Sequence, residues 1–244
     1  MRCFPKFRPR ISCQETVPSR PMKKLHWLIA LLICAPLAPS QVHAQQQPQF
    51  QAVPAPAPGR SSLPAKEIPP ATLLAELRKG GHVIYFRHTS TDFSRDDSRS
   101  QSDDDCTNQR PLTNRGQDEA RQIGAAIREL GIPIENVLAS PRCRTAETAM
   151  LAFGRAEKTH AVRGGPVNPQ QPDRYSELRR ILSTPPPSGS NLVISSHGNP
   201  FYAVAGTPYL AEGEAAVIRP LGKDFEIVAR VRHDSWRGLM KRDE

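Results

Sequence analysis

The stretch HVIYFRHTSTD, residues 82–92, is a short apolar run that stops abruptly on Arg87 and His88. Residues 83–86 are aliphatic or aromatic, which is typical of a buried strand, and small hydroxyl residues follow the pair. Any strand ends in something polar, so the pair is weak evidence by itself. The more specific interpretation is that the strand points two reactive groups into a pocket. The rest of the chain decides between this interpretation and an ordinary polar strand end.

The pattern on either side of this stretch predicts alternating strands and helices. Helical patterns occur at residues 71–81, 112–131, 143–154 and 173–182. Strand patterns occur at residues 82–86, 135–140, 159–162 and 191–196, with a closing hairpin at 214–220 and 225–231. This order predicts an α/β fold, a three-layer sandwich in which a mostly parallel central sheet has helices on both faces.

Three of the predicted strands end on related chemistry. They are followed by Arg-His at 87–88, Ser-Pro-Arg at 140–142 and Ser-Ser-His at 195–197. Ligands bind at the carboxyl ends of the strands in such sheets, so we expect two arginines and two histidines to meet at one edge. The planar fork of arginine suits phosphate, and a neutral imidazole between arginines can attack phosphorus.

The first 44 residues have the pattern of a secretory signal. They hold +6 of the net charge of +9, seven Lys or Arg against one Glu, which leaves +3 for residues 45–244. Two lysines precede the apolar run LHWLIALLICAPLA, which is short for a membrane span, and Val42 and Ala44 are small residues where a signal peptidase reads. We expect an N-terminal extension and signal peptide over residues 1–44, cleaved after Ala44; an uncleaved anchor is the alternative.

Residues 45–70 are rich in Gln, Pro and Ala and predict a disordered linker, followed by one folded domain over 71–244. This domain holds two of the five cysteines, Cys106 and Cys143. An even pair in an exported domain predicts one disulfide, with two unpaired buried thiols as the alternative. The small positive charge of the mature chain and its lack of interleaved basic and aromatic residues argue against a nucleic-acid partner.

Four motifs follow one another along the folded part. They are YFRHTS at 85–90, LTNRGQDEA at 112–120, VLASPRCRTAETA at 137–149 and LVISSHGNP at 192–200. In this order and spacing the chain resembles the histidine phosphatase superfamily, which has the phosphoglycerate-mutase-like fold. The resemblance covers nearly all of residues 73–231, and short exported members, including a lipopolysaccharide core heptose phosphate phosphatase, look most similar.

The resemblance implies a role for each matched residue. His88 would be the nucleophile that becomes phosphohistidine, and Arg87 would hold the phosphate beside it. His197 would be the second histidine of the pocket. The spacing of the motif assigns the second pocket arginine to Arg144, which leaves Arg142 as a nearby helper or substrate contact.

The general acid is not marked by a motif. Glu214 is the candidate that we select, with Glu212, Asp92 and the acids of residues 96–105 as alternatives. No cofactor and no metal are expected: the Asp run of that loop lacks the glycine turn and distal Glu of a calcium site. The arginines that flank the histidines would also repel a zinc ion.

Three more residues are expected to contact the substrate. Thr89 follows the nucleophile, Arg110 ends the long polar loop after the first strand, and Asn199 follows the last motif histidine. For Arg110 the alternative is a role in solvating the loop. For Asn199 the alternative is a cap on the helix that follows.

The sequence therefore predicts an exported, metal-independent phosphomonoester phosphatase that works through a phosphohistidine, located in the periplasm or secreted. Its partner would be a small phosphorylated substrate, with a sugar phosphate or the lipopolysaccharide core as candidates, and it would keep no stable membrane span after signal cleavage. The alternative is a non-catalytic protein that binds phosphate or glycan-phosphate on the same fold.

Overall fold

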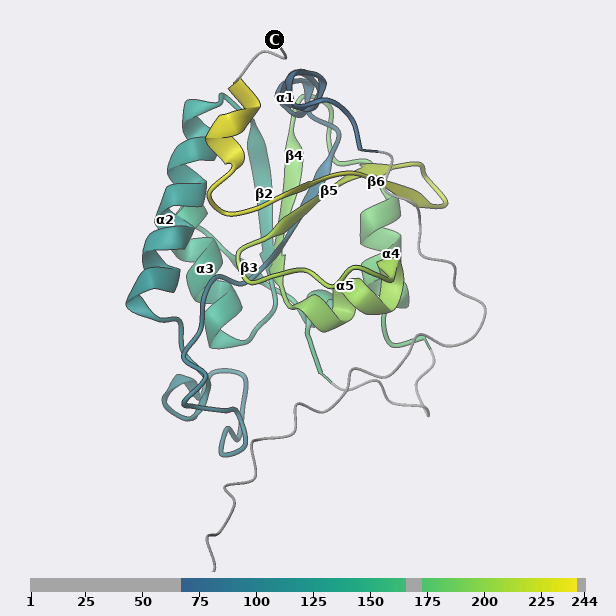
Figure 1. Cartoon of the computed structure of the whole chain (residues 1–244). Helices are drawn as coiled ribbons and strands as arrows, with labels where there is room; N and C mark the ends of the chain where they lie inside the picture. Colours follow the sequence, from purple (N-terminus) through teal and green to yellow (C-terminus); the bar gives the residue numbers. More distant parts are fainter. Residues whose placement is uncertain (1–66, 166–172, 241–244) are drawn as a thin grey trace, which may run out of the picture. The chain divides into compact units, whose positions relative to one another are not determined.

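The computed structural model describes residues 67–165 and 173–240 of the chain (Figure 1). The expected signal peptide and most of the expected linker lie outside these residues. None of the helices within the two described ranges is long and apolar enough to cross a membrane.

A six-stranded mixed sheet forms the centre of the described part (Figure 1). The strands are β1 Val83–Arg87, β2 Ile134–Ala139, β3 Glu157–Lys158, β4 Asn191–Ser196, β5 Ala215–Pro220 and β6 Phe225–Val231. Their order across the sheet is β3-β2-β4-β1-β5-β6. The first four in this order pair in parallel, whereas β5 is antiparallel to β1 and β6 is antiparallel to β5. The mostly parallel sheet and the closing hairpin are thus confirmed.

Helices cover both faces of the sheet (Figure 1). On one face lie α1 Pro70–Lys79, α2 Asn114–Glu129, α3 Cys143–Phe153 and a 3-10 helix, Trp236–Met240; on the other lie α4 Ser176–Ser183 and α5 Gly198–Ala205. Successive side chains of β1 alternate between the two cores: Ile84 and Phe86 join one, and Val83 and Tyr85 join the other. Because burying each such side chain stabilises by about 1.5–3 kcal/mol, β1 is held firmly from both sides.

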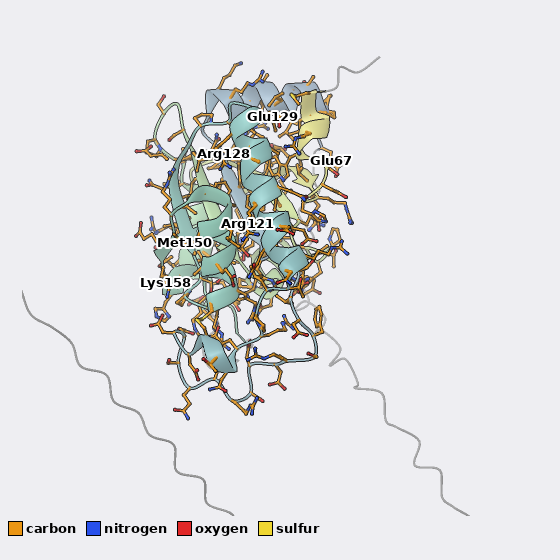
Figure 2. The ribbon with its side chains drawn as sticks, turned by 90° about the vertical axis from the view of Figure 1, so that its left-hand side faces the viewer. Glu67, Arg121, Arg128, Glu129, Met150 and Lys158 are labelled. Carbon is orange, nitrogen blue, oxygen red and sulfur yellow. A yellow bond between two sulfur atoms is a disulfide. The ribbon has the colours of Figure 1, made fainter. Side chains whose placement is uncertain are left out.

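α2 is fixed close to the end of β1 by its first turn. Thr113 is the N-cap, and its Oγ1 accepts a hydrogen bond from the Gly116 N–H at 3.0 Å. A Cβ atom at Gly116 would lie 2.0 Å from the carbonyl oxygen of Ser90, so only glycine allows this approach. The outer face of α2 carries exposed side chains such as Arg121 and Arg128 (Figure 2).

The strand predicted at 159–162 is wrong. The chain pairs with β2 slightly earlier, at β3, and residues 160–162 form a 3-10 turn instead. The hydroxyl of Thr159 accepts a hydrogen bond from the backbone N–H two residues later, and Val162 is fully buried. These local contacts turn the chain away from the sheet edge.

The first helix of the described residues begins one residue before the domain boundary expected at Ala71. α1 begins at Pro70, because proline has the backbone angle that the first helical position requires and no N–H to satisfy. Before it, Ile68 packs against the core and donates its N–H to the Val228 carbonyl oxygen at 3.1 Å. The helix predicted at residues 173–182 also has a different start, because α4 begins only at Ser176.

Candidate active site

The carboxyl ends of β1 and β4 place the first site residue. Arg87 ends β1 opposite Ser196, the last residue of β4. One residue further, His88 donates its backbone N–H to the Ser196 carbonyl oxygen at 3.0 Å, and its own carbonyl accepts from the Gly213 N–H at 2.9 Å. The backbone of His88 is therefore held from both sides.

The imidazole of His88 is buried and oriented, with 2% of the residue exposed. Its Nδ1 lies 3.0 Å from the carbonyl oxygen of Thr89, which only accepts hydrogen bonds, so Nδ1 carries the proton. Burial, followed by the positive charge of Arg144, lowers the pKa of His88 well below its ordinary value. The ring is therefore neutral at neutral pH, and Nε2 keeps a free lone pair.

His197 faces His88 across the site. The two ring centroids are 5.5 Å apart and the rings meet edge-on, at 73°. Nε2 of His197 lies 2.9 Å from the hydroxyl of Ser140, which follows β2 and fixes the ring orientation. Burial, followed by the nearby His88 and Arg144, also lowers the pKa of His197 well below its ordinary value. Three strand ends thus contribute to one site, as the sequence predicted.

Arg87 is anchored by the segment that precedes β5. Its Nη1 donates to the carbonyl oxygen of Leu210 at 2.9 Å, and its Nη2 donates to the Glu212 carboxylate at 3.3 Å. The guanidinium also lies over the ring of Tyr209, 5.4 Å from its centroid. Glu212 is itself fixed by Thr91, whose N–H and hydroxyl donate to it at 3.1 and 2.7 Å. The charge of Arg87 is therefore held at one wall of the site.

Arg144 supplies a second buried charge from the first turn of α3. Only 8% of its side chain is exposed, against 17% for Arg142. Both carboxylate oxygens of Asp97 lie 3.0 Å from Nη1 of Arg144, and one lies 3.2 Å from Nη2 of Arg142. Nε of Arg144 is buried and has no hydrogen-bond partner among the described residues.

Arg110 lies near the site as well. Its guanidinium stacks on the ring of Phe93, 4.6 Å from the centroid, and its Nε is buried without a partner in the described part of the chain. Its charge is one of those that lower the pKa of His88. Its backbone N–H donates to Asp97 at 2.8 Å, so Arg110 also supports the loop. Contact between the Arg110 side chain and a substrate phosphate stays a prediction.

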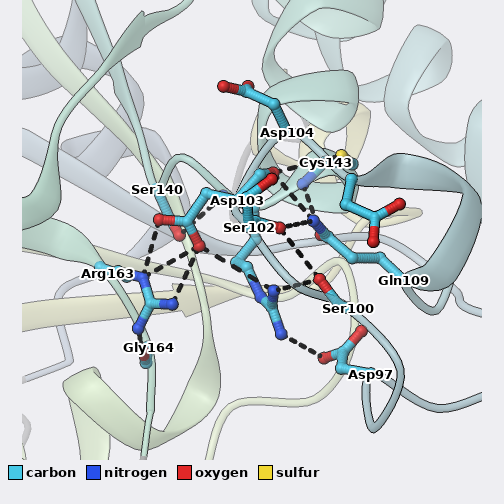
Figure 3. A network of polar contacts seen from close by, with 12 residues as sticks. Asp97, Ser100, Ser102, Asp103, Asp104, Gln109, Ser140, Cys143, Arg163 and Gly164 are labelled. Carbon is cyan, nitrogen blue, oxygen red and sulfur yellow. Dashed lines mark hydrogen bonds and ion pairs between the residues drawn. The ribbon is translucent and has the colours of Figure 1, made fainter.

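The segment of residues 90–110, here called the acidic loop, is fastened to the start of α3 (Figure 3). The expected disulfide between Cys106 and Cys143 is present and joins residues 37 positions apart. A closed loop of this length stabilises the fold by roughly 3–4 kcal/mol through chain entropy. Gln109 accepts from the Cys143 N–H at 3.0 Å, and Asp103 pairs with Arg163 at 2.9 Å.

Glu214 does not occupy the position expected of the general acid. Its carboxylate accepts from the Ala211 N–H at 2.7 Å and lies 3.8 Å from Nε of Arg230 on β6. Glu212, by contrast, lies 3.9 Å from Nδ1 of His88. Glu214 immediately precedes β5, and these contacts hold its side chain against its own turn and β6. The carboxylate beside the histidine is therefore that of Glu212.

Thr89 and Asn199, the other two expected substrate contacts, each have a protein partner, and their contact with substrate stays a prediction. The side chain of Thr89 is buried and its hydroxyl lies 3.3 Å from that of Thr148 on α3, so it fastens the turn after β1. Asn199, in the first turn of α5, donates to the carbonyl oxygen of Gly165 at 2.6 Å. It caps no helix and ties the segment before residue 166 to α5.

No group of three or more His, Cys, Asp or Glu side chains within residues 67–165 and 173–240 is arranged to hold a metal ion. The charge of the site comes from the four guanidinium groups of Arg87, Arg110, Arg142 and Arg144. Two carboxylates, Asp97 and Glu212, partly balance them. The arrangement suits a dianion that meets a neutral, nucleophilic imidazole.

The sequence matches one protein family over part of its length. Residues 83–163 match the histidine phosphatase superfamily (branch 1). This stretch contains β1, the acidic loop, α2, β2 and α3, and thus every arginine of the site. No curated protein matches the chain.

Solved structures share a similar backbone at low identity. The protein histidine phosphatase SixA, complexed with tungstate, has 21% identity and a TM-score of 0.44, covering 62% of this chain and 97% of its own. A protein from Thermus thermophilus has 16% identity and a TM-score of 0.42, covering 62% and 99%. A phosphoserine phosphatase mutant from Entamoeba histolytica, in complex with phosphoserine, has 11% identity and a TM-score of 0.43, covering 63% and 98%.

Proposed function

We propose that the chain is a phosphomonoester phosphatase of the histidine phosphatase type and that His88 is its covalent nucleophile. The observation that carries the proposal is the state of this imidazole. It is buried and neutral, its proton is held on Nδ1 by a backbone carbonyl, and its Nε2 has no partner among the described residues. Arg87 and Arg144 lie beside it, and the match to the family over residues 83–163 supports the same assignment.

In the proposed reaction the arginines bind the phosphate of the ester. Arg144 keeps Nε free for an oxygen of the phosphate, and the charge of Arg87 is fixed by Glu212. A guanidinium held in place in a buried site stabilises the spreading negative charge of the transition state without rearrangement. His197 adds a second imidazole. Its Nε2 contacts the Ser140 hydroxyl, and its Nδ1 has no hydrogen-bond partner among the described residues.

The chemistry proceeds in two displacements. Nε2 of His88 attacks phosphorus, an N–P bond forms, and the ester P–O bond breaks with the electron pair leaving on the alcohol oxygen, which takes up a proton from water. Water then attacks the phosphohistidine, the N–P bond breaks, and inorganic phosphate leaves with His88 restored. Splitting one displacement into two lowers each barrier. In this scheme Glu212 orients Arg87.

Turnover of a generic ester tests the proposal. The protein from Gln45 onward should hydrolyse p-nitrophenyl phosphate, and EDTA should leave the rate unchanged because arginines supply the positive charge. Release of p-nitrophenolate at pH 7, with and without chelator, is the measurement. Phosphate binding without turnover would instead support the non-catalytic binding protein, and loss of the rate in EDTA would contradict metal independence.

The substrate class follows from the same proposal. We propose a small phosphorylated molecule, with sugar phosphates and fragments of the lipopolysaccharide core as candidates. Phe93 of the acidic loop is 65% exposed and stacks with the guanidinium of Arg110, so an exposed aromatic ring lies next to one of the arginines near His88. Loops of this kind are where the specificity of a shared fold varies. Comparing kcat/KM across a panel of such phosphoesters identifies the preferred class.

We also propose that the enzyme is exported and works in the periplasm or outside the cell, without a membrane span after cleavage. The support is the signal pattern of residues 1–44 and the Cys106–Cys143 disulfide, which persists in oxidising compartments. N-terminal sequencing of the protein recovered from the exported fraction should give a chain that begins at Gln45. A mature chain that begins at Met1 or Met22 would contradict cleavage.

A further inference from the structure

We propose that Asp97 is a positioning residue of the phosphate site, which holds Arg144 so that one edge of its guanidinium is presented to the substrate phosphate. This inference rests on the proposed function and deepens it. It assigns a role in phosphate binding to Asp97, one acid of the acidic loop.

The contacts of Arg144 are divided between its two sides. Asp97 contacts Nη1 with both carboxylate oxygens, each at 3.0 Å. Nε is buried and has no partner among the described residues. Nε and Nη2 form the side edge of a guanidinium, which donates two parallel hydrogen bonds to a phosphate. Asp97 therefore contacts Nη1, the nitrogen that a phosphate bound to Nε and Nη2 would not use.

Asp97 lies on the solvent side of Arg144. Its side chain is 28% exposed, whereas that of Arg144 is 8% exposed. After burial, the main charges that lower the pKa of His88 are positive, those of Arg144, Arg87 and Arg110. Arg144 thus acts on His88 as a positive charge even though Asp97 pairs with it.

Asp97 is itself held by two further groups. The backbone N–H of Arg110 donates to it at 2.8 Å, and Nη2 of Arg142 lies 3.2 Å away. Arg142 also donates to the Ser100 hydroxyl at 3.1 Å, which joins two points of the acidic loop to α3 (Figure 3). The disulfide at Cys143, between the two arginines in sequence, fastens the same loop.

The contacts of Asp97 with both arginines reduce a local repulsion between positive charges. Arg142 and Arg144 stand two residues apart at the start of a helix, where their charges repel each other and the positive helix dipole. A carboxylate that contacts both removes the repulsion and fixes their side-chain torsions before substrate arrives. Binding then costs less side-chain entropy, so the gain should be in affinity for phosphate more than in the rate of the chemical step.

The test replaces Asp97 with Asn and compares it with Asp96→Asn. Asp96 is the neighbouring residue, and its side chain accepts hydrogen bonds only from Ser98 within the described residues, so the control makes the same charge change without touching Arg142 or Arg144. Asp97→Asn should raise both KM for p-nitrophenyl phosphate and the inhibition constant of inorganic phosphate by about tenfold, the cost of a lost charge-assisted hydrogen bond. kcat should change much less, and the control should match wild type.

Further measurements distinguish a positioning role of Asp97 from a purely structural role and from competition between Asp97 and phosphate for Arg144. Asp97→Glu keeps the charge and should recover most of the affinity, and replacing both Cys106 and Cys143 with Ser should weaken phosphate binding in the same direction. A merely structural role would lower kcat and the melting temperature and leave KM alone, which contradicts the inference. Tighter binding of inorganic phosphate to Asp97→Asn would also overturn it, because Asp97 would then compete with phosphate. A wild-type protein without turnover would instead refute the proposed function.

Discussion

His88→Ala should remove nearly all phosphatase activity, lowering kcat by at least about 10³-fold, because loss of a covalent nucleophile leaves only binding and electrostatic stabilisation. The substitution deletes the Nε2 lone pair but leaves Arg87, Arg110 and Arg144 in place. Inorganic phosphate should therefore still bind, within about tenfold of the wild-type affinity, since the charged donors remain. Steady-state kinetics and isothermal calorimetry measure the two quantities on the same protein.

The matched control for this variant is His160→Ala. The side chain of His160 is 78% exposed and lies outside the site, so its loss should leave kcat unchanged. Thermal unfolding of both variants shows whether a loss of activity reflects a loss of folded protein. A His88→Ala variant that keeps a substantial fraction of the rate would mean that another group attacks phosphorus.

Arg144→Ala should lower kcat/KM by about 10²–10³-fold, the usual cost of deleting one preorganised donor to the transition state. Unlike the loss of Asp97, it should lower kcat and raise KM together, because Arg144 grips the phosphate in the ground state and in the transition state. Arg144→Lys should recover only part of the loss, because an ammonium is a point charge and lacks the planar fork.

Arg121→Ala is the control for the loss of an arginine. Its side chain is 53% exposed on α2 and pairs only with Asp118 within the described residues, so it should not change either constant (Figure 2). An Arg144→Ala variant with wild-type kcat/KM would remove Arg144 from the site and leave Arg142 as the second pocket arginine.

The sequence predicted the sheet and the meeting of the strand ends because those features follow from short-range patterns. β1 and β4 are apolar runs bounded by polar or glycine residues, and parallel strands necessarily bring their carboxyl ends to one edge. That edge holds Arg87, His88 and His197. The strand predicted at 159–162 failed because Thr159 and its local hydrogen bond favour a turn, which apolar pattern alone does not reveal.

The carboxylates of the site were harder to predict. Glu212 and Glu214 are two residues apart, and which one faces His88 depends on where β5 begins. Asp97 is one of several acids in the acidic loop, and nothing in its sequence neighbours distinguishes it from Asp96. Its position depends on contacts with Arg142 and Arg144, far along the chain, and on the disulfide that brings them together.

Thr89 shows the same limit on a smaller scale. Its place after the nucleophile predicted contact with the substrate, but its hydroxyl packs against Thr148 of α3. Its carbonyl, which every residue possesses, sets the tautomer of His88. A backbone acceptor leaves no mark in the sequence, so this contribution is visible only in the folded chain.

Rapid-quench labelling with a ³²P-phosphoester shows directly whether His88 is phosphorylated during turnover. If it is, a protein-bound label forms within one turnover, is stable in base and labile in acid, and maps to the peptide that contains His88. The label should be absent from His88→Ala. A label on Ser195 or Ser196, or full turnover without any covalent phosphoenzyme under conditions that trap phosphohistidine, would contradict the account.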